Sequence, residues 1–281
     1  MKVVNIDIPE DHGYLIPIGD LHRGDRHFGT EGYTKLKGYL AWVMERPNAY
    51  IFLMGDILNV ASRSSATNPF ESDSGDHEYA QAVELFKPVA SRIIGAITGN
   101  HELRMSQQFG FNPLQPFCNE LGVPFLGYSA CIRVRVGKET CSKSNSKYNQ
   151  LYWGYAHHGT GGGATLGGAL NRKLKLSEVV QGVDFVMAGH DHQLITGVRE
   201  YYLPLAKRVT RLRTYYIDTG HYLDWDDSYV EEKHLPIGKM GSPRIRFDGR
   251  RGRGQQNWHK RKNKPSTLET ARNCHDIHVS I

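Results

Sequence analysis

Long apolar runs are absent from this 281-residue sequence. No stretch reaches the roughly 18 consecutive apolar residues that a membrane-spanning helix needs. The opening segment, MKVVNIDIPEDHGY, places acids and a proline where a signal peptide requires an apolar run. We therefore expect a cytoplasmic protein with no membrane partner.

Cysteine is also scarce, with 4 residues in the whole sequence. They show neither a CxxC pair nor the tight, even spacing of a disulfide framework. We therefore expect reduced thiols, and neither a disulfide-stapled fold nor a thiolate zinc site. The four residues are Cys118, Cys131, Cys141 and Cys274.

Positive charge is concentrated near the end of the chain. Hydrophobic residues at 39% and charged residues at 23% are ordinary for a soluble globular protein. The formal net charge of +6 comes from residues 242–265, which hold nine Lys or Arg against one acid, Asp248. We predict a catalytic domain over residues 1–241 and a basic C-terminal extension over residues 242–281. The nine cations are Arg244, Arg246, Arg250, Arg251, Arg253, Lys260, Arg261, Lys262 and Lys264.

Short β-rich runs alternate with helical patterns before this segment. Strands are predicted at residues 14–18, 49–54, 95–98, 185–188 and 213–218, with a hairpin over 130–136 and 151–156. Apolar residues at helical spacing predict helices over 34–45 and 77–94. Residues 277–281 are predicted to add a short final strand. This alternation indicates an α/β fold.

Five short polar motifs follow predicted strands, each at the point where a strand gives way to a loop. In open α/β sheets these carboxyl ends converge on one crevice, so residues far apart in sequence can meet there. An isolated Asp at such a place is often only a turn or capping residue, but five motifs in this order are a strong signal. The motifs are Gly19-Asp20-Leu21-His22, Gly55-Asp56, Gly99-Asn100-His101-Glu102, His157-His158-Gly159 and Gly189-His190-Asp191-His192.

These residue types suit a pair of divalent metal ions. Carboxylate and amide oxygens bind hard ions, whereas neutral imidazole suits borderline ions such as iron, zinc and nickel. Two ions about 3.5–4 Å apart need a shared ligand, and the carboxylate of Asp56 can bridge them. The first ion would take Asp20, His22 and one histidine of the 190/192 pair. The second would take Asn100, His158 and the other histidine.

In this order the motifs resemble the pattern D-x-H, G-D, G-N-H-[DE], H and G-H-x-H of the calcineurin-like metallophosphoesterase superfamily, over residues 14–220. The resemblance implies a four-layer α/β/β/α sandwich of two mixed sheets. It also implies that His192 binds the first metal and His190 the second. His101 would contact the substrate phosphate and protonate the leaving oxygen.

Two motifs leave alternatives open. A ligand directly before glycine is a common form in the superfamily, which favours His158 over the adjacent His157. The second motif continues as Ile57-Leu58-Asn59 and lacks the Asp-Arg-Gly of the Ser/Thr protein phosphatase branch. That difference argues against a protein phosphatase.

Cationic residues near the motifs indicate where substrate binds. Arg23 and Arg63 follow the first and second motifs, and with His157 they are candidate contacts for phosphate oxygens. The basic arm over residues 244–264, with Trp258, is a candidate nucleic-acid contact through phosphates and base stacking. The alternative for the arm is a solvated tail.

We therefore predict a dinuclear metal-dependent phosphoesterase with Asp56 and His101 as catalytic residues. Metal-activated hydroxide would hydrolyse phosphodiester bonds, with DNA or RNA as a candidate substrate. One alternative is a phosphomonoesterase or small-nucleotide phosphodiesterase of the same fold. Another is an inactive metal-binding scaffold for a partner protein. Manganese is the expected metal, with iron, zinc or nickel as alternatives, and the oligomeric state stays open.

Overall fold

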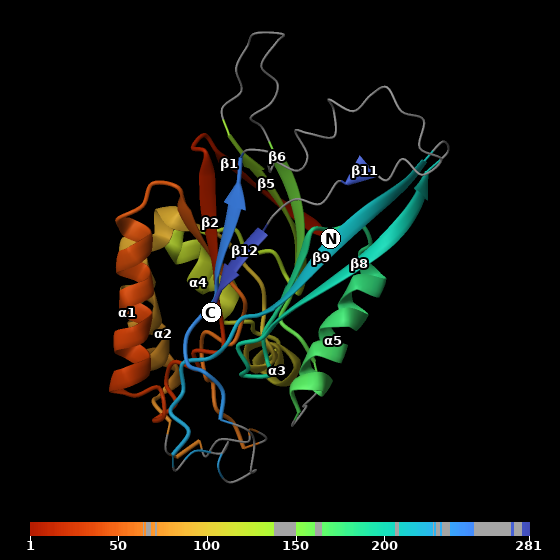
Figure 1. Cartoon of the computed structure of the whole chain (residues 1–281). Helices are drawn as coiled ribbons and strands as arrows, with labels where there is room; N and C mark the ends of the chain where they lie inside the picture. The colour runs from red at the N-terminus through yellow and green to blue at the C-terminus, as the bar shows by residue number, and fades with distance from the viewer. Residues whose placement is uncertain are drawn as a thin grey trace.

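Two mixed β-sheets form the centre of the molecule (Figure 1). The computed structural model describes residues 1–63, 65, 69–70, 72–137, 150–160, 165–205, 208–226, 228, 231, 237–249, 271–272 and 277–281. Within these ranges, sheet A runs in the order β1 (Lys2–Ile8), β5 (Ser129–Val136), β6 (Gln150–His157), β7 (Phe185–Ala188), β9 (Arg208–Asp218) and β11 (Ala271–Arg272), and β8 (Thr196–Leu205) pairs with β9. Sheet B runs in the order β12 (Ile277–Ser280), β10 (Arg244–Asp248), β2 (His12–Ile18), β3 (Ala49–Leu53) and β4 (Ile93–Ala96).

Helices cover the outer faces of both sheets. Figure 1 shows α1 (Thr30–Met44) and α2 (Gly75–Phe86) on one side of the molecule and α5 (Leu166–Val179) on the other. The helix α4 (Leu114–Leu121) packs with α2 on sheet B, and α3 (Asn100–Phe109) follows β4. A 3₁₀ helix, η1 (Lys87–Arg92), joins α2 to β4.

Three buried clusters separate these layers. Phe52 of sheet B and Phe185 of sheet A belong to the cluster between the sheets. Leu36 of α1 belongs to the cluster on the outer face of sheet B, and Leu170 of α5 packs against the cluster on the outer face of sheet A. The order helix, sheet, sheet, helix confirms the predicted four-layer sandwich.

Parallel pairing sets the position of the functional loops. Strands β2, β3 and β4 run parallel in sheet B, as do β6, β7 and β9 in sheet A. Strands β3 and β7 consist of apolar residues on both faces, as expected for strands covered on both sides. Because parallel strands end at the same edge, the loops after them gather there.

Two predicted elements differ from the structure. The helix predicted over residues 77–94 ends at Phe86, because Pro88 cannot continue an α-helix and the chain tightens into η1. Ile93 and Ile94 then belong to β4. Helix α1 begins at Thr30, earlier than the predicted start at residue 34.

The predicted basic arm also needs correction at its start. Residues 244–248 form β10, which pairs with β2 and with the predicted final strand, β12. Ile245 and Phe247 alternate with Arg244 and Arg246, so the apolar side chains enter the core between the sheets. Residues 250–264, including Trp258, lie outside the described residues, and the domain division at residue 241 stays a prediction.

Two further expectations concern cysteines and membranes. Cys118 and Cys131 are free thiols, whereas Cys141 and Cys274 lie outside the described residues. None of the helices in the described ranges has the length and hydrophobicity needed to cross a bilayer.

We predict that Phe247→Ala lowers the free energy of unfolding by about 3–5 kcal/mol, because it removes a fully buried aromatic side chain. Urea denaturation measures this change. The control is Arg246→Ala, at an exposed position whose ion pair with Asp248 contributes no more than about 1 kcal/mol. Equal, small effects of both substitutions would show that residues 244–248 do not belong to the core.

Candidate metal centre

The five motifs meet at the carboxyl edge of the two sheets. Asp20 and His22 follow β2, and Asp56 follows β3. Asn100 and His101 begin α3 after β4, His158 follows β6, and His190 and His192 follow β7. The structure thus brings together every residue of the predicted ligand set, from five different strand ends.

Unusual backbone conformations aim these side chains at one point. Five of the seven candidate ligands, the exceptions being Asn100 and His158, have positive φ angles of 47–73°. Such angles are uncommon for residues other than glycine and persist where surrounding contacts fix them. Here the amides of Leu21 and His22 both donate to the Asp56 carbonyl, at 2.9 and 3.0 Å. The first two motifs therefore hold each other in place.

Glycines in the motifs allow this close approach. A Cβ atom on Gly99 would lie 2.1 Å from Oδ1 of Asp56, and one on Gly189 would lie 2.5 Å from Oδ2 of Asp20. Any side chain at either position would displace a carboxylate. The Gly-Asn and Gly-His steps are therefore required by packing around the site.

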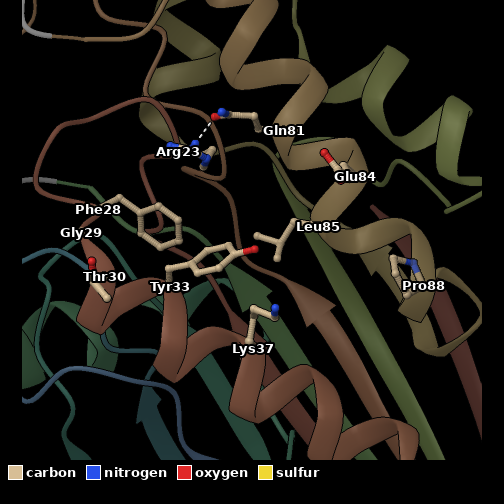
Figure 2. A pocket seen from close by; sticks show the side chains of 10 residues that line it. All are labelled: Arg23, Phe28, Gly29, Thr30, Tyr33, Lys37, Gln81, Glu84, Leu85 and Pro88. Atoms are coloured by element: carbon tan, nitrogen blue, oxygen red, sulfur yellow. Dashed lines mark hydrogen bonds between the residues drawn. The ribbon is translucent and has the colours of Figure 1, made fainter.

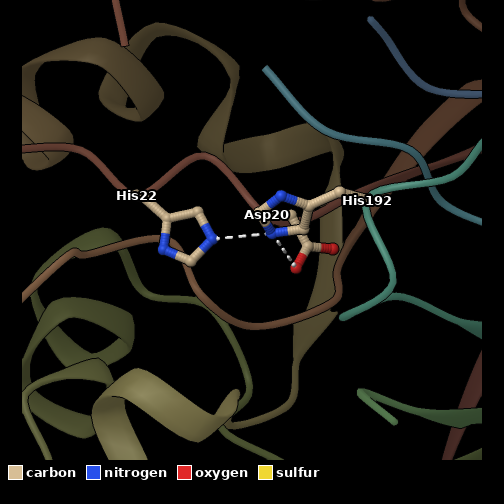
Figure 3. A group of neighbouring side chains, drawn as sticks. All are labelled: Asp20, His22 and His192. Carbon is tan, nitrogen blue, oxygen red and sulfur yellow. Dashed lines mark hydrogen bonds and ion pairs between the residues drawn. The ribbon is translucent and has the colours of Figure 1, made fainter. Parts of the chain in front are cut away.

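One group of candidate ligands consists of Asp20, His22 and His192 (Figure 3). The two Nε2 atoms of His22 and His192 are 3.1 Å apart. Nε2 of His192 lies 3.5 Å from Oδ1 of Asp20. The Asp56 carboxylate borders this group, with Oδ2 3.9 Å from Nε2 of His22.

A second group consists of Asp56, His158 and His190, joined by Asn100. Oδ1 of Asn100 lies 2.9 Å from Nε2 of His158 and 2.7 Å from Nδ1 of His190. Oδ2 of Asp56 lies 3.2 Å from Nε2 of His158. Asp56 therefore stands between the two groups.

These distances fit ligands arranged around metal ions. Two ligand atoms at right angles, each about 2.1 Å from one ion, are roughly 3 Å apart. Nδ1 of His158 lies 2.8 Å from the Met54 carbonyl oxygen and so carries a proton. In neutral His158, Nε2 then presents a lone pair toward Asn100 and Asp56. Oxygen and nitrogen lone pairs facing one another are stabilised only by a cation between them.

The ionisation of these residues shows the same demand for positive charge. Burial opposes protonation of His158, but the Asp56 carboxylate outweighs it and raises the pKa of His158 to about 10. Burial also disfavours the charged form of Asp20 and so raises its pKa. The hydrogen bond with His192 and the charge of His158 outweigh burial and lower the pKa of Asp20 to about 2. The site thus favours carboxylates together with a cation.

His101 lies at the edge of this cluster and is oriented by two contacts. Its amide donates to Oδ1 of Asp56 at 2.8 Å, and Nδ1 lies 2.6 Å from the Asn59 carbonyl oxygen. Nδ1 therefore holds a proton, and Nε2 is the atom left for substrate. Burial lowers the pKa of His101, while the charge of Asp56 opposes that shift.

Sequence reasoning missed the supporting role of Glu102. Its buried carboxylate accepts hydrogen bonds from the amides of Asp56, Ile57, Leu58 and Gly99, at 2.8–3.2 Å. It thereby fixes the Gly-Asp loop against the start of α3. The fourth letter of the Gly-Asn-His-Glu motif was the available signal.

Glu78 supports the next segment and had no sequence signal. It lies on α2, accepts a hydrogen bond from the Val60 amide at 2.9 Å and is 1% exposed. Val60 has a φ of 40°, which is strained for a β-branched residue. Glu78 therefore holds the turn that presents the Asn59 carbonyl to His101.

A buried lysine supports the last motif. Lys173 of α5 is 2% exposed, and its Nζ lies 2.6 Å from both Oδ2 of Asp191 and Oδ2 of Asp218. Asp191, the residue between the two candidate histidine ligands, also pairs with Arg172. Lys173 thereby ties the 190–192 loop to α5 and to the end of β9. A lysine on an otherwise ordinary amphipathic helix gave no sequence signal.

The three predicted substrate contacts lie outside the ligand groups. The Arg23 guanidinium contacts Gln81 of α2 and lines a cavity of about 700 Å³ (Figure 2). It also pairs with Asp73, which precedes α2. Nδ1 of His157 accepts a hydrogen bond from the Gly159 amide. Arg63 is exposed and lines another cavity, with Phe70 and Phe109.

We predict that Glu78→Gln flattens the pH dependence of stability between pH 4.5 and 8. Burial raises the pKa of Glu78 from 4.5 to about 8, although the Val60 hydrogen bond opposes this shift. The folded state therefore keeps a proton that the unfolded state releases, and the free energy of unfolding falls as pH rises through this window. In the variant, the slope of the free energy of unfolding against pH should be smaller by up to about 1.4 kcal/mol per pH unit. Urea denaturation at several pH values measures it, and Glu84→Gln, an exposed control on α2, should keep the wild-type slope.

We predict that Lys173→Met weakens Mn²⁺ binding by about 10–100-fold, because the partner that positions Asp191 is lost. It should also lower the free energy of unfolding by about 3–5 kcal/mol, since the buried Asp218 carboxylate loses its cation and Asp191 keeps only Arg172. Calorimetric titration and urea denaturation measure the two effects. Lys175→Met changes an exposed residue of the same helix. Equal Mn²⁺ affinities in both variants would contradict a role for Lys173 at the metal centre.

The known proteins similar to this chain include one protein family and several solved structures. A family model for calcineurin-like phosphoesterases matches residues 16–194. Similar solved structures include the calcineurin-like phosphoesterase YfkN from Bacillus subtilis, with 13% identity, 88% of this chain and 87% of that chain covered, and a TM-score of 0.41. A metallophosphoesterase from Sphaerobacter thermophilus has 13% identity, covers 84% of this chain and 83% of its own, and has a TM-score of 0.37.

No curated protein matches the sequence. The family model covers more than half of the chain. The chain therefore belongs to the calcineurin-like phosphoesterase family, and it is a metal-dependent phosphoesterase.

Proposed function

We propose that this enzyme is a two-metal phosphodiesterase. The observation that carries the proposal is the position of Asp56, whose Oδ2 lies 3.9 Å from Nε2 of His22 and 3.2 Å from Nε2 of His158. A carboxylate between two sets of ligand atoms is suited to bridging two ions.

Each ion has a defined set of candidate ligands. Asp20, His22 and His192 hold the first together with Asp56, and Asn100, His158 and His190 hold the second together with Asp56. This mixture of oxygen and imidazole nitrogen suits manganese, with iron, zinc and nickel as alternatives. Two such ions, when bound, polarise the phosphate ester and lower the pKa of water.

His101 is proposed to act on the substrate itself. Its Nδ1–H donates a hydrogen bond to the Asn59 carbonyl oxygen, so Nε2 is the atom that binds a phosphate oxygen. A second proton, taken up at Nε2, can pass to the leaving oxygen. Burial lowers the pKa of His101, and the charge of the adjacent Asp56 carboxylate only partly opposes that shift.

A phosphodiester is the proposed substrate class, with a polynucleotide as its physiological form. Described cations extend past the ligand set, at Lys239 and Arg244, and could contact groups beyond a single phosphate. Nucleic-acid binding through residues 250–264 stays a prediction. Strand β10 runs antiparallel to β2, so Asp248 lies opposite His12, at the end of β2 remote from the metal centre.

We predict that manganese-loaded enzyme hydrolyses bis-p-nitrophenyl phosphate faster than p-nitrophenyl phosphate. Asp56→Asn should abolish turnover, since the bridging carboxylate is lost, and His101→Ala should lower kcat by about 100- to 10,000-fold. The controls Asp7→Asn and His278→Ala change exposed residues on β1 and β12.

Each alternative function has its own outcome in this assay. Preference for the monoester would identify a phosphomonoesterase. Turnover of cyclic nucleotides but not of oligonucleotides would identify a small-nucleotide phosphodiesterase. No turnover with manganese, iron, zinc or nickel would leave a metal-binding scaffold. Full activity of His101→Ala would contradict the proposed proton transfer.

A further inference from the structure

A cationic cavity lies beside the metal centre and outside the candidate ligand set. It has a volume of about 430 Å³ and is lined by three cations, Lys35, Lys239 and Arg244, together with Tyr39 and Leu194. Among the described lining residues there is no Asp or Glu, although Ile281, whose terminal carboxylate is an anion, also lines the cavity. The cavity is therefore suited to an anion.

Lys239 belongs to a segment that packs on the last motif. A Cβ atom on Gly238 would lie 2.1 Å from the carbonyl oxygen of His192. Met240 forms a β-bridge with His221, whose ring stacks on His192 at 5.5 Å between centroids and 12° between planes. Lys239 lies between these two contacts. The wall of the cavity is thus continuous with a candidate metal ligand.

Of the other two cations, Lys35 lies on α1 and Arg244 packs against that helix. A Cβ atom on Gly241 would lie 3.3 Å from Cε of Lys35 and 2.9 Å from Oη of Tyr39. The Arg244 guanidinium lies over the rings of Tyr39 and Trp42, 5.2 and 4.9 Å from their centroids. Ring contacts of this kind hold a cation without neutralising its charge.

The charges of these three residues are not compensated within the described part of the chain. None of them forms an ion pair there, with a side chain or with the terminal carboxylate, and Nε of Arg244 is buried without a hydrogen-bond partner. By contrast, Arg246 on the same strand pairs with Asp248 at 2.9 Å. The three cations therefore remain able to bind an external anion.

We propose that this cavity binds backbone phosphates of a polynucleotide strand whose scissile phosphodiester lies at the metal centre. The proposal rests on the proposed function. Lysine and arginine provide the contacts that neutralise backbone phosphates. Leu194 of the cavity is two residues from His192, a span of at most about 7 Å. Successive phosphates of one strand are about 3.4 Å apart along a duplex axis, so phosphates within a few nucleotides of the scissile bond reach the cavity.

The test is the double substitution Lys35→Gln with Lys239→Gln, at two exposed positions. The matched control, Lys87→Gln with Lys175→Gln, removes the same charge from exposed positions outside the cavity. Fluorescence anisotropy measures binding of a short labelled single-stranded DNA in chelator, so the result does not depend on turnover. Hydrolysis of bis-p-nitrophenyl phosphate is followed in parallel.

The cavity variant should bind the DNA about tenfold more weakly than wild type. Its plot of log affinity against log salt should be less steep by about 1.4, the value for two lost phosphate contacts on a single strand. Its bis-p-nitrophenyl phosphate turnover should equal that of wild type, because so small a diester does not extend into the cavity. Lys35→Glu with Lys239→Glu should weaken DNA binding further.

Unchanged DNA affinity, or an equal loss in the control variant, would overturn the proposal. Equal loss of turnover on the small diester would also overturn it, since the lysines would then act at the metal centre itself. Absence of diester hydrolysis in wild-type enzyme would instead refute the proposed function, while the anisotropy comparison would still report on the cavity.

Discussion

The close approach of nitrogen and oxygen atoms at the strand ends is the constraint on which the rest of the site depends. Two imidazole nitrogens approach to 3.1 Å, and one amide oxygen lies within 2.9 Å of two more. Such an arrangement is stable only when cations lie between the lone pairs, or when protons replace them. A proton on His158 meets the same requirement, and the pKa of His158 is accordingly raised to about 10.

Buried polar side chains behind the ligands hold this arrangement together. Glu102 fixes the loops after β3 and β4, Glu78 holds the turn that orients His101, and Lys173 fixes Asp191. Burying a polar or charged group is costly unless it is paired or hydrogen-bonded, and each of these groups is. The supports lie on three different helices, so helix packing controls the geometry of the metal centre.

Much of the site could be predicted because its chemistry is local in sequence. Each motif places its donors directly after a strand, so Asp56 or His192 could be assigned without knowledge of the tertiary contacts. Glu78 and Lys173 could not, since their partners lie 18 residues away or more. In the fold, the Ile245–Phe247 alternation was overlooked because the surrounding arginines dominated the pattern. The direction in which Arg23 points likewise depends on where α2 packs. A local sequence pattern predicts the helix but not its position.

Anomalous diffraction from crystals loaded with manganese would locate the ions directly. We expect two peaks about 3.5–4 Å apart, one on each side of the Asp56 carboxylate. One peak should contact Asp20, His22 and His192, and the other Asn100, His158 and His190. A single peak, or two peaks that do not share Asp56, would contradict the bridged two-metal centre.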